Sequence, residues 1–192
     1  MSFLGRIFGG RANAHYRAGM AAFNAGRHEE ALGRFARAVD CGGADSDPIL
    51  ALARFYAAES AGHVGKRALE RGETAVARQL FERALEWNPE HPPLQYLASV
   101  TAAAGGDLAR AASLLPAVLA ADPAHREALL LFAAVRHAVG ARAEARALLS
   151  ALHPGGTLAP YFQQLLEQLA PDFQELTSLL RDFATSGRSP LG

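Results

Sequence analysis

The side chains that could carry out chemistry in this sequence are a set of scattered histidines and a single cysteine. No two histidines lie four residues apart and no His-Glu-x-x-His segment occurs, although a zinc site on one helix requires such spacings. The expected arrangement is therefore histidines scattered over the surface or the groove, and no metal site is predicted. The seven are His15, His28, His63, His91, His125, His137 and His153.

The remaining candidates for a reactive or phosphate-binding group are Cys41, Glu29-Glu30 and Gly65-Lys66. Cys41 has no basic neighbour in the sequence and falls at the end of an expected helix, which predicts an inert thiol. The two glutamates fall in a first helical turn, where carboxylates interact favourably with the helix dipole. Gly65-Lys66 lacks the spacing and the preceding strand of a phosphate-binding loop. No catalytic residue and no cofactor are predicted, which favours a non-enzymatic protein.

The composition is typical of a globular, helical protein. Of the 192 residues 42 are Ala and 27 are Leu, whereas Val, Ile and Thr together supply 14, and this balance favours helix over sheet. The 19 basic and 19 acidic residues cancel, which argues against a protein that coats nucleic acid. One cysteine excludes an internal disulfide, no apolar run approaches the length of a membrane span, and residues 1–10 do not resemble a secretory signal. The cytoplasm is the expected location.

A 34-residue repeat organises the chain. Gly72, Gly106 and Gly140 follow one another at this constant interval, and each is followed by an alanine five positions later and by Phe or Leu nine positions later. An earlier unit with the same internal offsets begins at Gly26, which precedes Gly72 by more than one interval, so a 12-residue insertion separates the first two units. The repeated alanines are Ala31, Ala77, Ala111 and Ala145, and the repeated large residues are Phe35, Phe81, Leu115 and Leu149.

Each unit predicts two helices joined at its glycine, which can adopt the left-handed backbone conformation of a tight turn. The small alanine lets the paired helices approach closely, and the Phe or Leu on the same face fills the core between them. Asp47-Pro48 and Asp122-Pro123 each predict a helix start, with the acid as N-cap and proline in the first turn. Gly62 and Gly65 are expected to bend or break the long helix after Pro48, and Pro116 to kink another. Helix pairs are expected near residues 13–25 and 29–41, 92–104 and 107–121, and 124–139 and 143–152.

This period and these residues resemble the tetratricopeptide repeat family, with Gly19, Gly65, Ser99 and Ala133 at the small positions of the first helices. The resemblance implies an all-α, right-handed solenoid of about four helix pairs over residues 12–153. Two further amphipathic stretches in residues 154–185 are expected to form C-terminal capping helices, and residues 186–192 a disordered tail.

The resemblance also implies a concave wall built from the first helix of each pair, which binds another protein. The side chains that this register places on the wall are mostly apolar and predict a groove for an apolar or amphipathic partner segment. The alternatives are that the chain's own C-terminal helix or a second copy covers the groove. The expected lining is Tyr16, Met20, Phe23, Asn24, Tyr96, Val100, Leu130, Ala134 and His137.

Residues 1–11 form a separate amphipathic segment in this interpretation, because Phe3, Leu4, Ile7 and Phe8 share one face of a short helix. Gly9-Gly10 is expected to uncouple this segment from the first repeat. It could dock on a protein groove, including that of a second copy, cap the first repeat, or contact a membrane weakly. An adaptor for protein–protein interactions is therefore the favoured function, a peripheral membrane tether is the alternative, and an RNA-binding helical repeat is disfavoured by the zero net charge.

Overall fold

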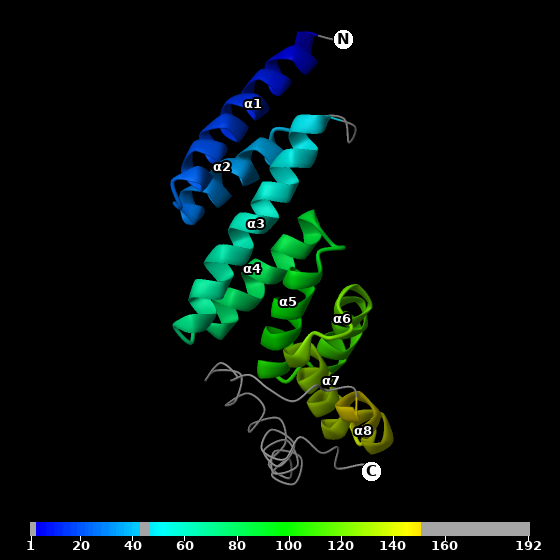
Figure 1. The fold of residues 1–192 in the computed structure, drawn as a ribbon. Helices are drawn as coiled ribbons and strands as arrows, with labels where there is room; N and C mark the ends of the chain where they lie inside the picture. Colours follow the sequence, from blue (N-terminus) through cyan, green and yellow to red (C-terminus); the bar gives the residue numbers. More distant parts are fainter. Residues whose placement is uncertain (1–2, 43–46, 151–192) are drawn as a thin grey trace. The chain divides into compact units, whose positions relative to one another are not determined.

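A computed structural model describes residues 3–42 and 47–150, and these residues form helices without any strand (Figure 1). The all-α expectation is therefore confirmed for the described residues. None of their helices is long and apolar enough to cross a membrane. The helices are α1 (Phe3–Asn24), α2 (His28–Asp40), α3 (Pro48–Glu70), α4 (Thr74–Trp87), α5 (Pro92–Ala104), α6 (Leu108–Ala121), α7 (Arg126–Ala138) and α8 (Arg142–Ser150).

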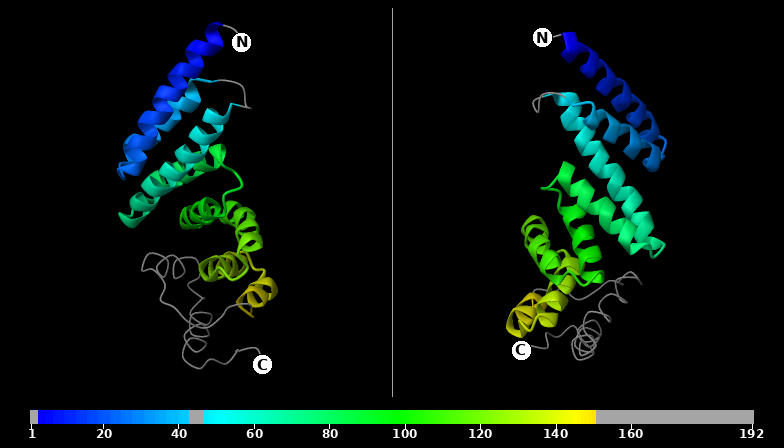
Figure 2. Two further views of the ribbon diagram at one scale, coloured as in Figure 1. Left: turned by 45° about the horizontal axis from the view of Figure 1, so that its top comes forward. Right: turned by 180° about the vertical axis from the view of Figure 1, so that it is seen from behind.

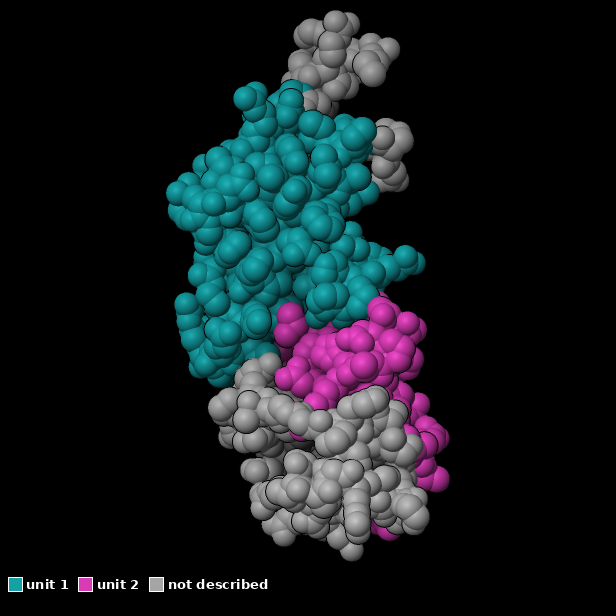
Figure 3. Space-filling view, viewed as in Figure 1, with its two compact units in different colours: residues 1–94 teal, residues 95–192 magenta. Residues whose placement is uncertain are grey.

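The chain divides into two compact units, residues 1–94 and residues 95–192, called unit 1 and unit 2 below (Figure 3). In unit 1, α2 packs against α1 and α3, and α3 packs against α4. In unit 2, α7 packs against both α6 and α8. Consecutive helices run back and forth as pairs in both views of Figure 2, which is the helix-pair arrangement that the repeat predicts.

The four repeat glycines form the turns inside these pairs. Gly26, Gly72, Gly106 and Gly140 have φ angles of 71°, 77°, 79° and 84°, which is the left-handed region that glycine enters without steric penalty. After α1, the N–H of Gly26 donates to the carbonyl of Phe23, and the N–H of Arg27 donates to that of Ala22, both at 2.9 Å. The same two bonds recur at the other three turns. This pattern is the Schellman motif, which satisfies carbonyls at a helix end, and it confirms the predicted role of the glycines.

Small residues in the first helices let aromatic rings fill the space between paired helices. A Cβ added to Gly19 would lie 2.7 Å from the ring of Phe35, and one added to Gly65 would lie 2.6 Å from the ring of Phe81. Both rings are fully buried. The repeated alanines of the second helices are buried as well, which confirms the close helix contacts expected at Ala31, Ala77, Ala111 and Ala145.

Helix α3 is longer than the usual first helix of a pair and is continuous. The Asp47 carboxylate accepts the N–H of Ile49 at 2.9 Å and Pro48 occupies the first turn, so the predicted helix start is confirmed. The break considered at Gly62 and Gly65 is not observed, since one helix runs from Pro48 to Glu70. Both glycines are buried where neighbouring side chains approach them closely. Helix α6 likewise continues across Pro116 from Leu108 to Ala121.

Two expectations about helix boundaries are wrong. Asp122 is the C-terminal cap of α6, its carboxylate accepts the N–H of Ala124 at 3.0 Å, and α7 begins only at Arg126 with His125 as its N-cap. Asp122-Pro123 thus forms a turn rather than the first turn of a helix. Gly9-Gly10 does not interrupt α1, which is helical from Phe3 to Asn24, so the N-terminal segment and the first repeat share one helix. The predicted capping helices and tail lie outside the described residues.

Candidate partner-binding surface

Three of the four residues predicted to line the groove in unit 1 come together with side chains from two further helices. Tyr16, Met20 and Phe23 from α1, Tyr56 from α3 and Trp87 from α4 are partly buried and pack on a closed core. These five residues are called the aromatic cluster below. The core beneath them consists of Ala22, Ala31, Phe35 and Ala57.

Tyr56 is the hub of the aromatic cluster. Its ring centroid lies 5.3 Å from that of Phe23, 5.5 Å from that of Phe35 and 6.3 Å from that of Tyr16. Ring pairs at such separations add about 0.5–1.5 kcal/mol each beyond the burial of apolar area. The rings of Tyr16, Phe23 and Tyr56 are therefore held in place by one another and by Phe35, while every member of the cluster retains accessible surface.

Tyr16 contributes a hydroxyl group to this mainly aromatic surface. Burial, and secondarily the phenol of Tyr56, raise the pKa of Tyr16 above the ordinary value of 10.0. Its hydroxyl therefore stays protonated at neutral pH and can donate a hydrogen bond. Asn24, the fourth predicted residue of this unit, is exposed at the last position of α1 and is not part of the cluster.

Most of the predicted lining of unit 2 lies in its interior. The exposed fractions are 7% for Tyr96, 1% for Val100, 1% for Leu130 and 0% for Ala134, so these side chains offer almost no accessible surface. The hydroxyl of Tyr96 is 3.1 Å from a carboxylate oxygen of Glu127, to which it donates. The sequence spacing selected positions on α5 and α7, and in the structure these side chains belong to the buried core. His137 is half-buried in the last turn of α7.

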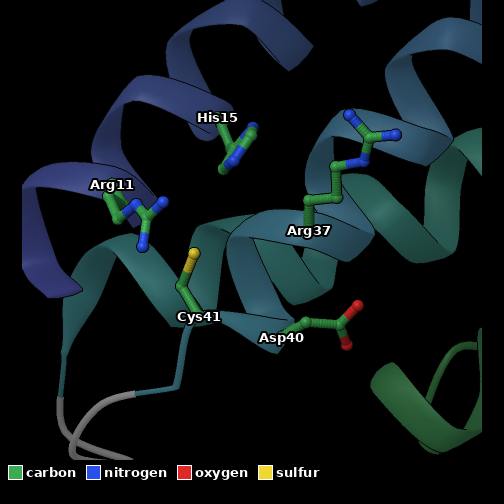
Figure 4. Close-up of a pocket in the computed structure, with 5 residues that line it drawn as sticks. All are labelled: Arg11, His15, Arg37, Asp40 and Cys41. Atoms are coloured by element: carbon green, nitrogen blue, oxygen red, sulfur yellow. The ribbon is translucent and has the colours of Figure 1, made fainter.

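A hollow between α1 and the end of α2 was not predicted. It is lined by Arg11 and His15 from α1 and by Arg37, Asp40 and Cys41 at the end of α2 (Figure 4). Cys41 is a free, half-buried thiol. The hollow brings it together with the basic side chains of Arg11 and Arg37, which the sequence neighbours of Cys41 did not indicate. No group of three or more histidine, cysteine or acidic side chains within the described residues could hold a metal ion.

Two histidines occupy equivalent positions in consecutive repeats. His91 and His125 are one repeat interval apart, and each Nδ1 accepts a backbone N–H at 3.4 Å, from Leu94 and Ala128 respectively, as a helix N-cap. The other ring nitrogen of His91 lies 2.7 Å from a carboxylate oxygen of Glu59. The repeat interval between these histidines was the signal in the sequence for their capping role. A polar residue that recurs at the same position next to a turn indicates a structural function.

Comparison with known proteins places a family match in the middle of the chain. Residues 68–115 match the model of the tetratricopeptide repeat, a stretch that contains the turn glycines Gly72 and Gly106. A comparison with curated protein sequences finds no match.

Several solved structures resemble the chain at low sequence identity. A mutant of MamA is 17% identical and covers 92% of each chain with a TM-score of 0.48. YrrB, described as a tetratricopeptide repeat protein with an unusual peptide-binding site, is 18% identical over 87% of this chain and 73% of its own, with a TM-score of 0.47. PilF of Pseudomonas aeruginosa is 18% identical over 92% and 88% of the two chains, with a TM-score of 0.47. The family-model match shows a tetratricopeptide repeat at residues 68–115, within a series of helix pairs turned by left-handed glycines.

Proposed function

We propose that the chain is a non-enzymatic adaptor that binds another protein through the aromatic cluster of unit 1. The observation that carries this proposal is the packing of five partly buried aromatic and methionine side chains on one closed core. Interfaces are dominated by a few central anchors of this kind, and Met20 gives the surface a flexible side chain that can adapt to a partner. The proposal is confined to unit 1, because the corresponding side chains of unit 2 are buried.

The chemistry of the cluster favours an apolar or amphipathic segment as the ligand. Rings of Tyr16, Phe23 and Tyr56 offer large contact areas at little cost in conformational entropy, and the Tyr16 hydroxyl can donate to a backbone carbonyl. A helix presenting apolar residues along one face, or a short extended segment with one aromatic anchor, would satisfy this surface.

The test is a selection of peptides from a random display library on the immobilised full-length chain. We expect the selected peptides to be rich in aromatic and aliphatic residues, and their affinity to fall at least tenfold with Met20→Glu, which places a charge in the cluster. Arg142→Ala, an exposed position at the start of α8, is the matched control and should bind like the wild type. Fluorescence anisotropy measures the affinities, and circular dichroism confirms that both variants are folded.

Equal affinity of the selected peptides for wild type and Met20→Glu would remove the aromatic cluster as the binding surface. Tyr96→Ala is not a suitable probe, because Tyr96 is buried and bonded to Glu127, so its loss would disturb the packing of unit 2.

A further inference from the structure

Two histidines from neighbouring repeats are stacked face to face in unit 1. His28 is the first residue of α2 and His63 lies in α3, and their ring centroids are 4.1 Å apart with an angle of 12° between the planes. Phe23 of α1 stands edge-on to both rings, at 5.2 Å from His28 and 6.1 Å from His63. The Nδ1 atom of His28 is buried and has no hydrogen-bond partner.

The charged groups around this stack oppose protonation of His28. From α3 it faces His63 and Arg67, from α2 it faces Glu29, and from α1 it faces the uncharged ring of Phe23. The Glu29 carboxylate is already engaged, since Arg67 Nη2 donates to it at 2.8 Å. This anion is therefore shared with a permanent cation, and an imidazolium at His28 would gain little from it.

We propose that the His28–His63 stack is a proton-sensitive joint between the first and second repeats, holding α2 against α3 while both rings are neutral and loosening when either ring is protonated. Neutral imidazoles stack as two aromatic rings, whereas a proton on His28 places a charge in a partly dehydrated contact beside Arg67. A proton on His63 places a like charge against the same ring, and two protonated rings at this separation repel each other directly. The Arg67–Glu29 ion pair joins the same two helices, so a shift of α2 relative to α3 would disturb both contacts.

The direction of the pH effect follows from the surroundings of His28. Burial first, and then His63 and Arg67, hold the pKa of His28 below its ordinary value of 6.5, and Glu29 offsets this only in part. As the pH falls through about 6.5, the open or unfolded form takes up a proton that the closed joint does not, so stability is lost on acidification. The stability is fully present above pH 6.5, and the loss levels off below the pKa of the closed form.

The experiment combines imidazole titrations by nuclear magnetic resonance with hydrogen exchange on the full chain. His63→Phe and the double variant His28→Phe/His63→Phe retain ring contacts but remove one or both protonation sites. In the wild type we expect His28 to titrate below 6.5, and in His63→Phe to titrate at a higher pH, since one opposing charge is gone. Amide protection in α2 and α3 should fall between pH 7.5 and 5.0 in the wild type, after correction for intrinsic exchange rates, and this fall should be largely absent in the double variant.

His15→Gln is the matched control, because His15 is a half-buried histidine of unit 1 outside the stack, and it should retain the full wild-type response. If the double variant is unfolded at pH 7.5, His63→Phe alone decides the outcome, because His63 is exposed. A His28 midpoint at or above 6.5, a midpoint unchanged in His63→Phe, or amide protection of α2 and α3 that does not depend on pH would overturn the proposal.

Discussion

Two glycines on adjacent helices of unit 1 have opposite effects on stability. Gly19 of α1 faces the buried ring of Phe35, and no room exists for a Cβ at that position. Gly33 of α2 is exposed, and nothing lies within 4 Å of a Cβ added there. The first glycine is thus required for packing, whereas the second only weakens the helix that contains it.

This contrast gives a paired prediction for single methyl groups. Gly19→Ala should lower the free energy of unfolding by about 1–3 kcal/mol, because the Cβ overpacks against a core ring that cannot move into solvent. Gly33→Ala should raise it by up to about 1 kcal/mol, the difference in helix propensity between the two residues. Urea unfolding followed by circular dichroism measures both changes, and a Gly19→Ala chain with the wild-type midpoint would show that Phe35 can shift.

At the scale of the elements, caps and close contacts determine where helices begin and how near they pack. Asp47 caps the first turn of the long helix α3. In α6, Ala111 is fully buried at a close contact with neighbouring helices. One substitution removes each feature, and the two substitutions lower the free energy of unfolding for different physical reasons.

Asp47→Ala should destabilise the chain by about 0.5–2 kcal/mol, because the N–H of Ile49 loses its acceptor. Asp40→Ala is the control, since this exposed carboxylate ends α2, where a negative charge interacts unfavourably with the helix dipole. Thermal unfolding should show a lower midpoint for Asp47→Ala and an equal or higher midpoint for Asp40→Ala. A wild-type midpoint for Asp47→Ala would mean that water replaces the cap.

Ala111→Trp should be more damaging than the loss of a cap. The alanine is completely buried in α6, and an indole cannot enter the contact without separating the helices, at a cost of about 1–3 kcal/mol or more. Ala109→Trp, two positions earlier in the same helix at an exposed site, should be tolerated. Chemical denaturation of both variants makes the comparison, and similar midpoints would contradict a close helix contact at position 111.

At the scale of the whole molecule, the two units have differently composed cores. The largest buried side chains of unit 1 include the rings of Phe35 and Phe81, whereas those of unit 2 include Leu115, Leu130 and Leu131. The N-terminal turns belong to α1 itself, because the helix continues through Gly9 and Gly10. Any partner of the Phe3–Phe8 segment would therefore be connected to the first repeat through helical backbone.

Phe3→Ser/Phe8→Ser is expected to change the oligomeric state of the full chain without affecting lipid binding. The segment spans only about two turns and carries few charges, which is too little for stable attachment to a membrane surface. Light scattering should detect the change in assembly, and the wild type should not sediment with anionic liposomes. Sedimentation of the wild type that is lost in the double variant would instead support the membrane tether.

The sequence alone determined the helix pairs, their turns and the small positions between them. These features are local: a glycine that must enter the left-handed region, an alanine or glycine where backbones approach, and an apolar residue nine positions after each turn glycine. Tyr16, Met20 and Phe23 pack on the same core for a similar reason, since they share one face of one helix.

Only the tertiary structure decided which helix faces are covered. Tyr56 and Trp87 join the aromatic cluster from α3 and α4, and His28 meets His63 across two repeats, because neighbouring helices pack at angles and offsets that no spacing encodes. Burial also differs between equivalent positions of the repeat. Tyr16 and Met20 remain partly accessible in unit 1, whereas their counterparts Tyr96 and Val100 are buried in unit 2.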